Sequence, residues 1–352
     1  VKAITPNIDK LARSGTLFNN AYCQQAVCNP SRASVLTGLR PDENGVTDLV
    51  THFREKVPNV VTLPQAFKNA GYTSVGVGKI FHGTKNTMDA VSWSDDEMKT
   101  LPKKSGEYTL AKNKTGGKAA ALEFVEGPDN RYPDGKMVET SIGLLRKFKK
   151  SGEPFFLATG FTKPHLPFCA PKKYWDLYQQ TDFSEIPNKN RPLNSPAIAY
   201  HEWQELRGYT DIPDQGPITA QQQQELIRGY YACISYLDEQ IGKLMEELDR
   251  SGLRQNTIIV LWGDHGYHLG ELDLWCKSTN FELDTRIPLM IAAPGITQVP
   301  AKTDAIVEAV DIYPTLADIC GINPDTKLSG KSLKPLLQQP RMKWDHVAYS
   351  QF

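Results

Sequence analysis

The sequence predicts an α/β protein with a doubly wound, mostly parallel sheet that is flanked by helices. Segments with helical periodicity alternate with short apolar runs along the whole chain. The strongest run, at 257–262, reads Thr-Ile-Ile-Val-Leu-Trp, which is typical of a strand buried on both faces of a parallel sheet. The length of 352 residues and the 40% of hydrophobic side chains fit a globular chain of this class.

The charge balance and the cysteine pattern exclude several classes of protein. Lys and Arg number 40, as do Asp and Glu, so the basic excess of a general nucleic-acid binder is absent. No apolar run approaches the roughly 20 residues of a membrane span. The six cysteines are scattered, without the spacing of a zinc site or the density of a disulfide scaffold. We therefore expect neither a nucleic-acid partner nor a membrane span.

The elements of the first half each have a local cause. The first helix begins at Pro6, which suits a first helical position, and ends at Gly15. A strand at 17–21 leads to a short helix whose first residue is Cys28 and which Gly38 ends. The same alternation predicts a helix at 63–71, a strand at 72–77, a helix at 137–150 and a buried strand at 154–160.

The second half continues the alternation. The longest helix is predicted at 219–251, because apolar side chains recur there every three or four residues from Leu226 to Leu248. After this helix, we predict strands at 257–262, 287–293 and 305–310 and a helix at 314–320.

The remaining segments set the expected domain organisation. Residues 84–135 and 169–217 lack periodicity and are predicted to be loop-rich insertions. A further strand is predicted from Trp344 to the last residue. We therefore predict one large α/β domain over 1–340, with 341–352 as the incomplete start of a C-terminal subdomain.

Side chains that can act as a nucleophile, bind an anion or hold a metal follow the predicted strands. In a doubly wound sheet, functional groups gather where strands end and helices begin. Cys28 begins a helix, where the helix dipole and the nearby Arg32 favour an anion. The other junctions carry Lys79 with His82, His165, Asp264 with His265, and Lys277.

Each of these residues alone has an ordinary structural explanation. Cys28 could be a small packed side chain, Asp264 a helix cap, and the lysines surface residues. Together, however, they describe a pocket with several cations, a nucleophile and a metal-binding carboxylate. Such a pocket suits a tetrahedral or planar oxyanion, namely sulfate, phosphate or phosphonate.

One segment makes a family resemblance specific. Residues 28–38 read Cys-Asn-Pro-Ser-Arg-Ala-Ser-Val-Leu-Thr-Gly, which resembles the signature of type I, formylglycine-dependent sulfatases of the alkaline phosphatase-like superfamily. Further segments resemble the same family in the same order along the chain. Within it, the chain looks most like the iduronate-2-sulfatase branch, on the segments 24–28, 77–82 and 275–281.

The resemblance implies a covalent mechanism. A separate formylglycine-generating enzyme would convert Cys28 to formylglycine, whose hydrate carries two hydroxyls on one carbon. One hydroxyl would attack sulfur and displace the sugar alcohol, and the other would then lose its proton so that sulfate leaves. A divalent metal, Ca²⁺ in most relatives, would be held by Asp264, His265 and the residue at position 28.

The resemblance also implies roles for the other residues. Arg32 would hold the formylglycine hydroxyl, and Lys79 and Lys277 would bind the sulfate oxygens. His82 would take the proton that releases sulfate, and His165 would lie near the leaving oxygen. Lys277 is favoured as the general acid toward that oxygen, with His165 as the competing candidate.

The chain departs from the family pattern at both ends. Sulfatases usually open with a strand that ends in an Asp-Asp pair, which supplies two further metal ligands, and no such pair precedes Thr5. A small antiparallel sheet usually follows at the C-terminus. We therefore expect an N-terminal strand and a C-terminal sheet to be missing or truncated, and we favour an N-terminal extension over a poor metal site.

Three functions remain open at this point. The favoured one is a sulfuric ester hydrolase for a sulfated sugar or oligosaccharide, with a 2-O-sulfated uronic acid as the expected residue. The first alternative is a phosphonate or phosphate diester hydrolase of the same superfamily. The second is a non-catalytic, truncated relative. The family acts on extracellular or lysosomal glycans, so a periplasmic, secreted or lysosomal location is expected.

Overall fold

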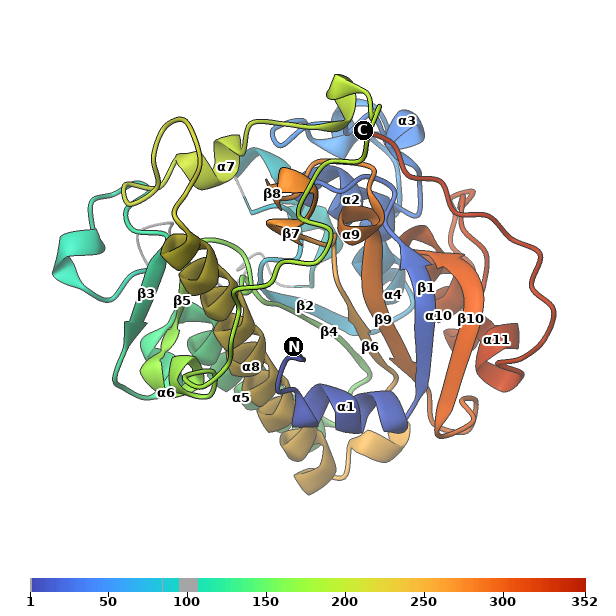
Figure 1. The fold of residues 1–352 in the computed structure, drawn as a ribbon. Helices are drawn as coiled ribbons and strands as arrows, with labels where there is room; N and C mark the ends of the chain where they lie inside the picture. Colours follow the sequence, from blue (N-terminus) through green and yellow to red (C-terminus); the bar gives the residue numbers. More distant parts are fainter. Residues whose placement is uncertain (1, 84, 95–106) are drawn as a thin grey trace.

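A mixed four-stranded sheet forms the centre of the fold, in the order β10-β1-β9-β6 (Figure 1). The computed structural model describes residues 2–83, 85–94 and 107–352. The strands are β10 (Ala301–Glu308), β1 (Thr16–Tyr22), β9 (Arg286–Ala292) and β6 (Ile259–Trp262). β10 pairs parallel with β1, whereas β9 pairs antiparallel with both β1 and β6. Three of the four strands therefore run in one direction, as expected for the predicted class.

Three two-stranded sheets complete the strand pairing in the described residues. β2 (Thr73–Gly78) pairs parallel with β4 (Phe155–Gly160), and β3 (Leu122–Val125) pairs parallel with β5 (Phe168–Pro171). β7 (His268–Leu269) and β8 (Trp275–Cys276) form a short antiparallel hairpin. The carboxyl ends of β2, β4 and β6, together with this hairpin, carry predicted site residues.

The helices begin and end near the predicted positions. Thr219 caps the long helix by accepting from the Gln222 backbone N–H, and Gly38 ends the helix that Cys28 begins, with a φ of 70°. None of the described helices has the length and apolar character needed to cross a membrane. The helices are α1 (Pro6–Arg13), α2 (Cys28–Thr37), α3 (Pro41–Asn44), α4 (Leu63–Asn69), α5 (Pro133–Ser151), α6 (Lys172–Asp176), α7 (Gln204–Arg207), α8 (Ala220–Arg250), α9 (Glu282–Thr285), α10 (Ile312–Cys320) and α11 (Lys334–Gln338).

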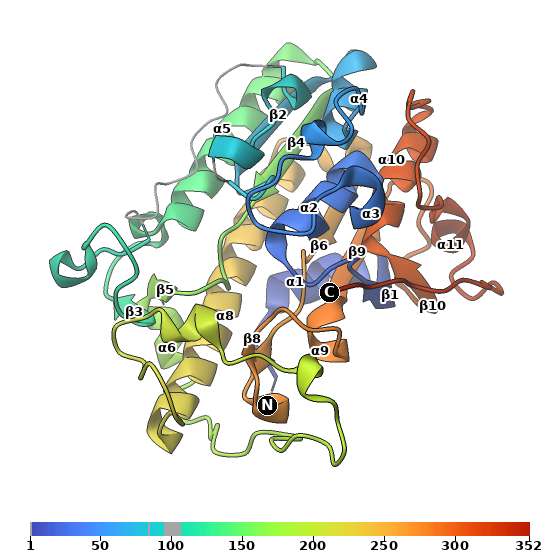
Figure 2. The same ribbon diagram turned by 90° about the horizontal axis from the view of Figure 1, so that it is seen from above.

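The helices cover the sheets from two sides. In Figure 2, α5 and α8 lie on one side of the molecule and α10 and α11 on the other. One buried apolar cluster joins the central sheet to α10 and α11 through residues such as Phe18, Tyr313 and Leu337. A second joins α8 to β5 through Leu226 and Phe168. α2 is almost entirely buried, and it packs against the first cluster through Val35 and against a third cluster through Ala33 and Leu36.

Two strands are more exposed than the sequence predicts. The run 257–262 is half-buried, not buried on both faces, and the same holds for all residues of β4. The reason is their place in the sheets. β6 is the terminal strand beside β9, and β4 pairs only with β2 among the described strands.

The strand predicted from Trp344 is wrong. Residues 343–352 form no regular element. The segment is instead held by single bonds to different partners: the Tyr349 N–H donates to Glu308, and the Gln351 N–H donates to the Gln24 carbonyl. Such scattered partners do not make a ladder.

The two predicted insertions contain some regular structure. Within 84–135, β3 and several single turns are formed, and residues 84 and 95–106 lie outside the described residues. Within 169–217, the short helices α6 and α7 are formed. The second insertion matters for the site, because α7 reaches it.

Candidate active site

The site is built around the first residue of α2. Cys28 is 2% exposed, and the backbone N–H groups of this first helical turn have no partner within the helix. Its Sγ lies 3.2 Å from Nε2 of His265, and Nζ of Lys79 lies 3.5 Å from the same sulfur. Residues from α2, from the end of β2 and from the end of β6 therefore meet at one atom.

The charges around Cys28 favour an anion at this position. Burial raises the pKa of the Cys28 thiol, but Lys79, His265 and Lys277 outweigh that effect and hold the pKa well below its usual value. The same three cations would stabilise any other negative charge placed there.

Arg32 lies one helical turn after Cys28 and joins three segments. Its Nε donates to Oδ2 of Asp264 at 2.8 Å, and its NH1 donates to the backbone carbonyls of Lys79 and Ile80. Burial raises the pKa of Asp264, but Arg32, His265 and Lys79 together hold it far below its usual range. Asp264 is therefore a fixed carboxylate at the end of β6.

Three donor groups could hold a metal ion. Sγ of Cys28, a carboxylate oxygen of Asp264 and a ring nitrogen of His265 all lie within 4.8 Å of one another. In the described part of the chain, no other His, Cys, Asp or Glu joins this group. A carboxylate beside an imidazole fits a divalent cation, but three donors are only part of the roughly 6–8 oxygen ligands that Ca²⁺ takes.

Lys277 is presented by a strained turn after β8. The residues on either side of it, Cys276 and Ser278, have φ angles of 72° and 92°, which side chains with a Cβ rarely adopt. Two contacts hold this backbone: Tyr267 donates to Sγ of Cys276, and Asp284 accepts from the backbone and side chain of Thr279. Lys277 itself is 5% exposed.

Asp284 also contacts the segment that precedes this turn, at His268 and Gly266. Its Oδ1 lies 2.6 Å from Nδ1 of His268, and both side chains are fully buried. Its backbone carbonyl accepts from the Gly266 N–H, next to His265. The segments that carry His265 and Lys277 are thus tied together through one carboxylate and its backbone.

His165 lies in the loop between β4 and β5. Lys163 is buried beneath this loop and donates to the carbonyls of His165 and Pro167, while Asp134 accepts from the Lys163 N–H. The Nδ1 of His165 faces the carbonyl of Leu166. Its Nε2 lies 3.0 Å from Oε1 of Glu205.

Glu205 is a site residue that the sequence did not reveal. It lies on α7 in the second insertion, and its Oε2 accepts from Nζ of Lys277 while its Oε1 faces His165. The segment around it has no apolar periodicity and matches none of the quoted family motifs. No sequence signal therefore pointed to it.

His82 is placed differently from the other predicted residues. It is half-buried after β2, and its Nδ1 is buried without a hydrogen-bond partner among the described residues. Side-chain contacts link the other predicted residues into two groups. One holds Cys28, Arg32, Lys79, Asp264 and His265, and the other joins His165 to Lys277 through Glu205.

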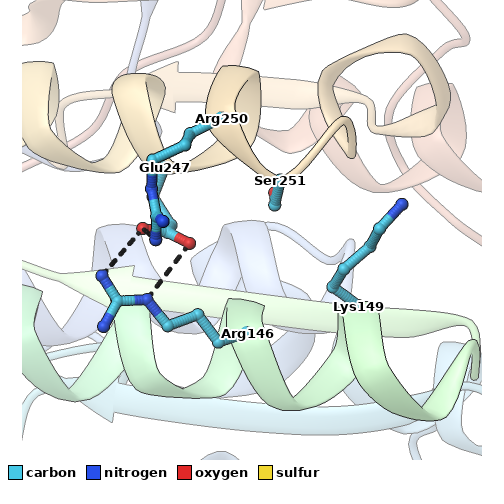
Figure 3. A pocket seen from close by; sticks show the side chains of 5 residues that line it. All are labelled: Arg146, Lys149, Glu247, Arg250 and Ser251. Atoms are coloured by element: carbon cyan, nitrogen blue, oxygen red, sulfur yellow. Dashed lines mark hydrogen bonds and ion pairs between the residues drawn. The ribbon is translucent and has the colours of Figure 1, made fainter.

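A separate open hollow lies between the C-terminal ends of α5 and α8 (Figure 3). Arg146 and Arg250 both donate to Glu247 there, and Lys149 and Ser251 complete the lining. None of these residues belongs to the predicted site. The hollow is therefore a charged contact between two helices, with Lys149 and Arg250 in the last helical turns, where the dipole favours cations.

Comparison with known proteins assigns the chain to the same family as its sequence motifs do. Residues 1–322 match the family model for sulfatases. The chain belongs to the sulfatase family. The prediction made from residues 28–38 is thereby confirmed at the level of the family.

Among curated sulfatases, iduronate 2-sulfatase from Mus musculus is 37% identical over 356 residues. The alignment covers 90% of this chain and 64% of the mouse protein. The human iduronate 2-sulfatase is 35% identical over the same share of this chain. The chain thus spans slightly less than two thirds of the length of these relatives.

Solved structures confirm the predicted α/β fold class. BT4656, solved in complex with its substrate D-glucosamine-2-N,6-O-disulfate, matches with a TM-score of 0.74 at 23% identity, covering 95% of this chain and 75% of that one. The phosphonate monoester hydrolase of Agrobacterium radiobacter matches with a TM-score of 0.75 at 20% identity, covering 96% and 72%. At these identities the likeness concerns the fold alone.

Proposed function

We propose that this sulfatase-family chain carries the active site of a sulfuric ester hydrolase that acts on a sulfated sugar. The observation that carries the proposal is the group of cations around Cys28. Lys79 and His265 contact the sulfur directly, and Lys277 contributes its charge. A sulfate group is a tetrahedral anion, and such a cluster binds it most strongly where negative charge develops during the reaction.

The nucleophile is proposed to be Cys28 after its conversion to formylglycine by a generating enzyme. The hydrated aldehyde would supply one hydroxyl that attacks sulfur and a second whose deprotonation lets sulfate leave. Arg32 supports this position, because its guanidinium fixes both Asp264 and the backbone of Lys79. His82 would take the proton in the release step, which its unpartnered Nδ1 allows.

The sugar oxygen that leaves the sulfur needs a proton, which must come from the side of the sulfate opposite the nucleophile. Lys277 is proposed as the general acid, with His165 as the competing candidate, and Lys79 and Lys277 would hold the sulfate oxygens. Burial lowers the pKa of Lys277, but Cys28 and Glu205 outweigh that effect and raise it above the usual value. Glu205 stays beside the ammonium after Cys28 is converted, so Lys277 is proposed to carry its proton at neutral pH.

A divalent cation is proposed as the cofactor. Asp264 and His265, with the residue at position 28, would hold it, and its charge would draw electrons from a bound sulfate. We propose Ca²⁺, because the fixed carboxylate of Asp264 is a hard oxygen donor.

The substrate is proposed to be a 2-O-sulfated uronic acid within a glycosaminoglycan-like chain. The support is the identity of 37% with mouse iduronate 2-sulfatase. A phosphonate or phosphate diester remains an outcome of the test, as does a relative that does not turn over. We also propose a periplasmic, secreted or lysosomal location, where sulfated glycans are degraded.

The first experiment is peptide mass spectrometry across Cys28, on protein produced together with a formylglycine-generating enzyme. Replacement of the thiol-bearing CH₂SH group by CHO is expected. The same protein is then assayed with a 2-O-sulfated uronate disaccharide and with a phosphonate monoester. Release of sulfate that greatly exceeds phosphonate cleavage supports the proposal, and the reverse preference rejects it.

Two cysteine variants make the assay specific. Cys28→Ala is expected to abolish sulfate release without loss of the fold. Cys320→Ala removes a half-buried cysteine outside the site and should keep normal turnover. Near-normal turnover by Cys28→Ala would show that the nucleophile has been assigned wrongly.

A further inference from the structure

We infer that Glu205 is a positioning residue that holds Lys277 and His165 together as one unit on the leaving-group side of the site. The inference rests on the proposed sulfate ester hydrolysis. Its basis is the geometry of one carboxylate, whose two oxygens face the side chains of His165 and Lys277. Both of those side chains are candidates for the proton donor.

The contact to Lys277 keeps a buried ammonium charged. The Lys277 side chain is 5% exposed, and an ammonium removed from water tends to lose its proton unless an opposite charge lies beside it. Glu205 supplies that charge in the free site, and a bound sulfate would supply it in the complex. Glu205 also fixes the direction of Nζ, since the ammonium donates to a carboxylate whose own position is set by its helix.

The contact to His165 fixes the orientation of its ring. Nδ1 faces the carbonyl oxygen of Leu166, and Nε2 faces Oε1 of Glu205. A carboxylate can only accept, so a proton on Nε2 would point toward Oε1. Glu205 thus orients the ring of His165 beside the ammonium of Lys277.

Glu205 is itself rigidly held. Trp203, immediately before α7, donates from Nε1 to the Asp273 carbonyl, in the hairpin that also carries Lys277. Lys118 donates to the backbone carbonyl of Glu205, and Arg207 donates to the carbonyls of Pro213 and Gly216. Anchors on both sides of one short helix indicate a carboxylate placed in advance, which is what a positioning residue requires.

The negative charge of Glu205 should weaken sulfate binding by a measurable amount. Glu205 lies beside groups that would bind an anionic sulfate, so its charge weakens the binding of the substrate while it organises the proton donors. Removal of the charge should therefore affect binding and turnover in opposite directions. A side chain with only a structural role would not produce that split.

The test compares Glu205→Gln with wild type in two measurements. Steady-state kinetics with a sulfate ester should show kcat reduced at least tenfold, with KM unchanged or lower. Calorimetric titration with inorganic sulfate should show affinity raised at least threefold. Glu202→Gln removes the same charge from an exposed side chain three residues earlier and should change both quantities less than twofold.

Each outcome decides the inference. If Glu205→Gln behaves like Glu202→Gln in both measurements, the inference is wrong. If Glu205→Gln does not fold, Glu205→Asp is measured in the same way. That variant keeps the charge but shortens its reach, so kcat should fall without any gain in sulfate affinity, and an unchanged kcat rejects the inference. Wild-type protein that binds sulfate more weakly than Glu205→Gln yet releases none from any ester would overturn the proposed function alone.

Discussion

Arg32 and Asp264 form an ion pair that connects α2 to the end of β6, with 2.8 Å between Nε and Oδ2. The two side chains are 11% and 18% exposed, so the pair is largely shielded from water. The same guanidinium donates to the carbonyls of Lys79 and Ile80 after β2. One side chain therefore sets the relative positions of the three segments that meet at Cys28.

Arg32→Ala is expected to lower both stability and turnover. Removing one partner of a shielded pair leaves an uncompensated carboxylate, at a cost of about 3 kcal/mol in the free energy of unfolding. It also frees the Lys79 backbone, so turnover per folded molecule should fall at least a hundredfold. Chemical denaturation and a sulfate-release assay measure the two effects.

Arg40→Ala is the matched control for this variant. Arg40 makes a bidentate pair with the buried carboxylate of Glu308, away from Cys28. Its loss should destabilise the protein by a similar amount yet leave the turnover of folded molecules unchanged. Equal losses of turnover in the two variants would reduce Arg32 to a general stabilising residue.

Gly160→Ala is expected to displace Lys79. A Cβ at position 160 would overlap the backbone carbonyl of Lys79, which belongs to the neighbouring strand end and cannot move aside like a flexible side chain. We expect a loss of about 2 kcal/mol in stability and a drop in kcat, because Nζ of Lys79 shifts away from Cys28.

Gly143→Ala, in contrast to Gly160→Ala, is expected to stabilise the protein. Gly143 lies inside α5, and a Cβ there meets no atom within 4 Å. Alanine is the better helix former, so this variant should be up to about 1 kcal/mol more stable with unchanged activity. Thermal unfolding of both variants separates the cost of close approach from the general effect of replacing a glycine.

The sequence predicts the centre of the site better than its rim. Cys28, Lys79, Asp264 and His265 each follow from a local rule, since a helix start or strand end places them at one edge of the sheet. The left-handed Gly38 likewise follows from its place after a helix. Periodicity and capping therefore suffice for the scaffold and for the residues that the scaffold itself positions.

The rest depends on contacts that have no local pattern. Glu205 reaches the site from a proline-rich insertion, so its position is set by distant anchors such as Trp203 on Asp273. The exposure of 257–262 depends on which strands lie beside it, not on its own residues. The strand wrongly predicted from Trp344 has β-forming side chains, but its backbone partners are scattered. Propensity cannot supply a missing partner strand.

Lys277→Ala is expected to lower the catalytic rate far more than the stability. The lysine is proposed to bind the sulfate and to protonate the leaving oxygen, and the loss of such a group commonly costs a hundredfold or more. Lys334→Ala, which breaks a surface pair with Asp318, should change neither rate nor stability appreciably. A large fall in melting temperature with unchanged turnover would make Lys277 a structural residue.

Asp129 should make the stability of the protein depend on pH in the acid range. Its carboxylate accepts from Tyr174, Gln240 and Lys243, and Lys173 lies 2.9 Å away. Burial raises the pKa of Asp129, but Lys243, Lys173 and Gln240 outweigh it and lower the pKa to about 2. The unfolded chain has an ordinary Asp pKa of about 3.9, so the carboxylate stabilises the folded state above that pH by about 2 kcal/mol.

This contribution disappears as the pH falls through about 4 toward 2, because the folded state then gains the proton that the unfolded state already holds. Asp129→Asn should therefore be less stable than wild type at pH 7, and the difference in the free energy of unfolding should shrink steadily below pH 4. Urea denaturation at several pH values measures it. Asp311, whose pKa burial raises to about 6, has the opposite sign, since its cost to stability is relieved as the pH falls below 6. Asp311 is present in both proteins, so its contribution cancels when their free energies of unfolding are subtracted. A difference in free energy that stays constant from pH 7 to pH 3 would therefore contradict the role assigned to Asp129.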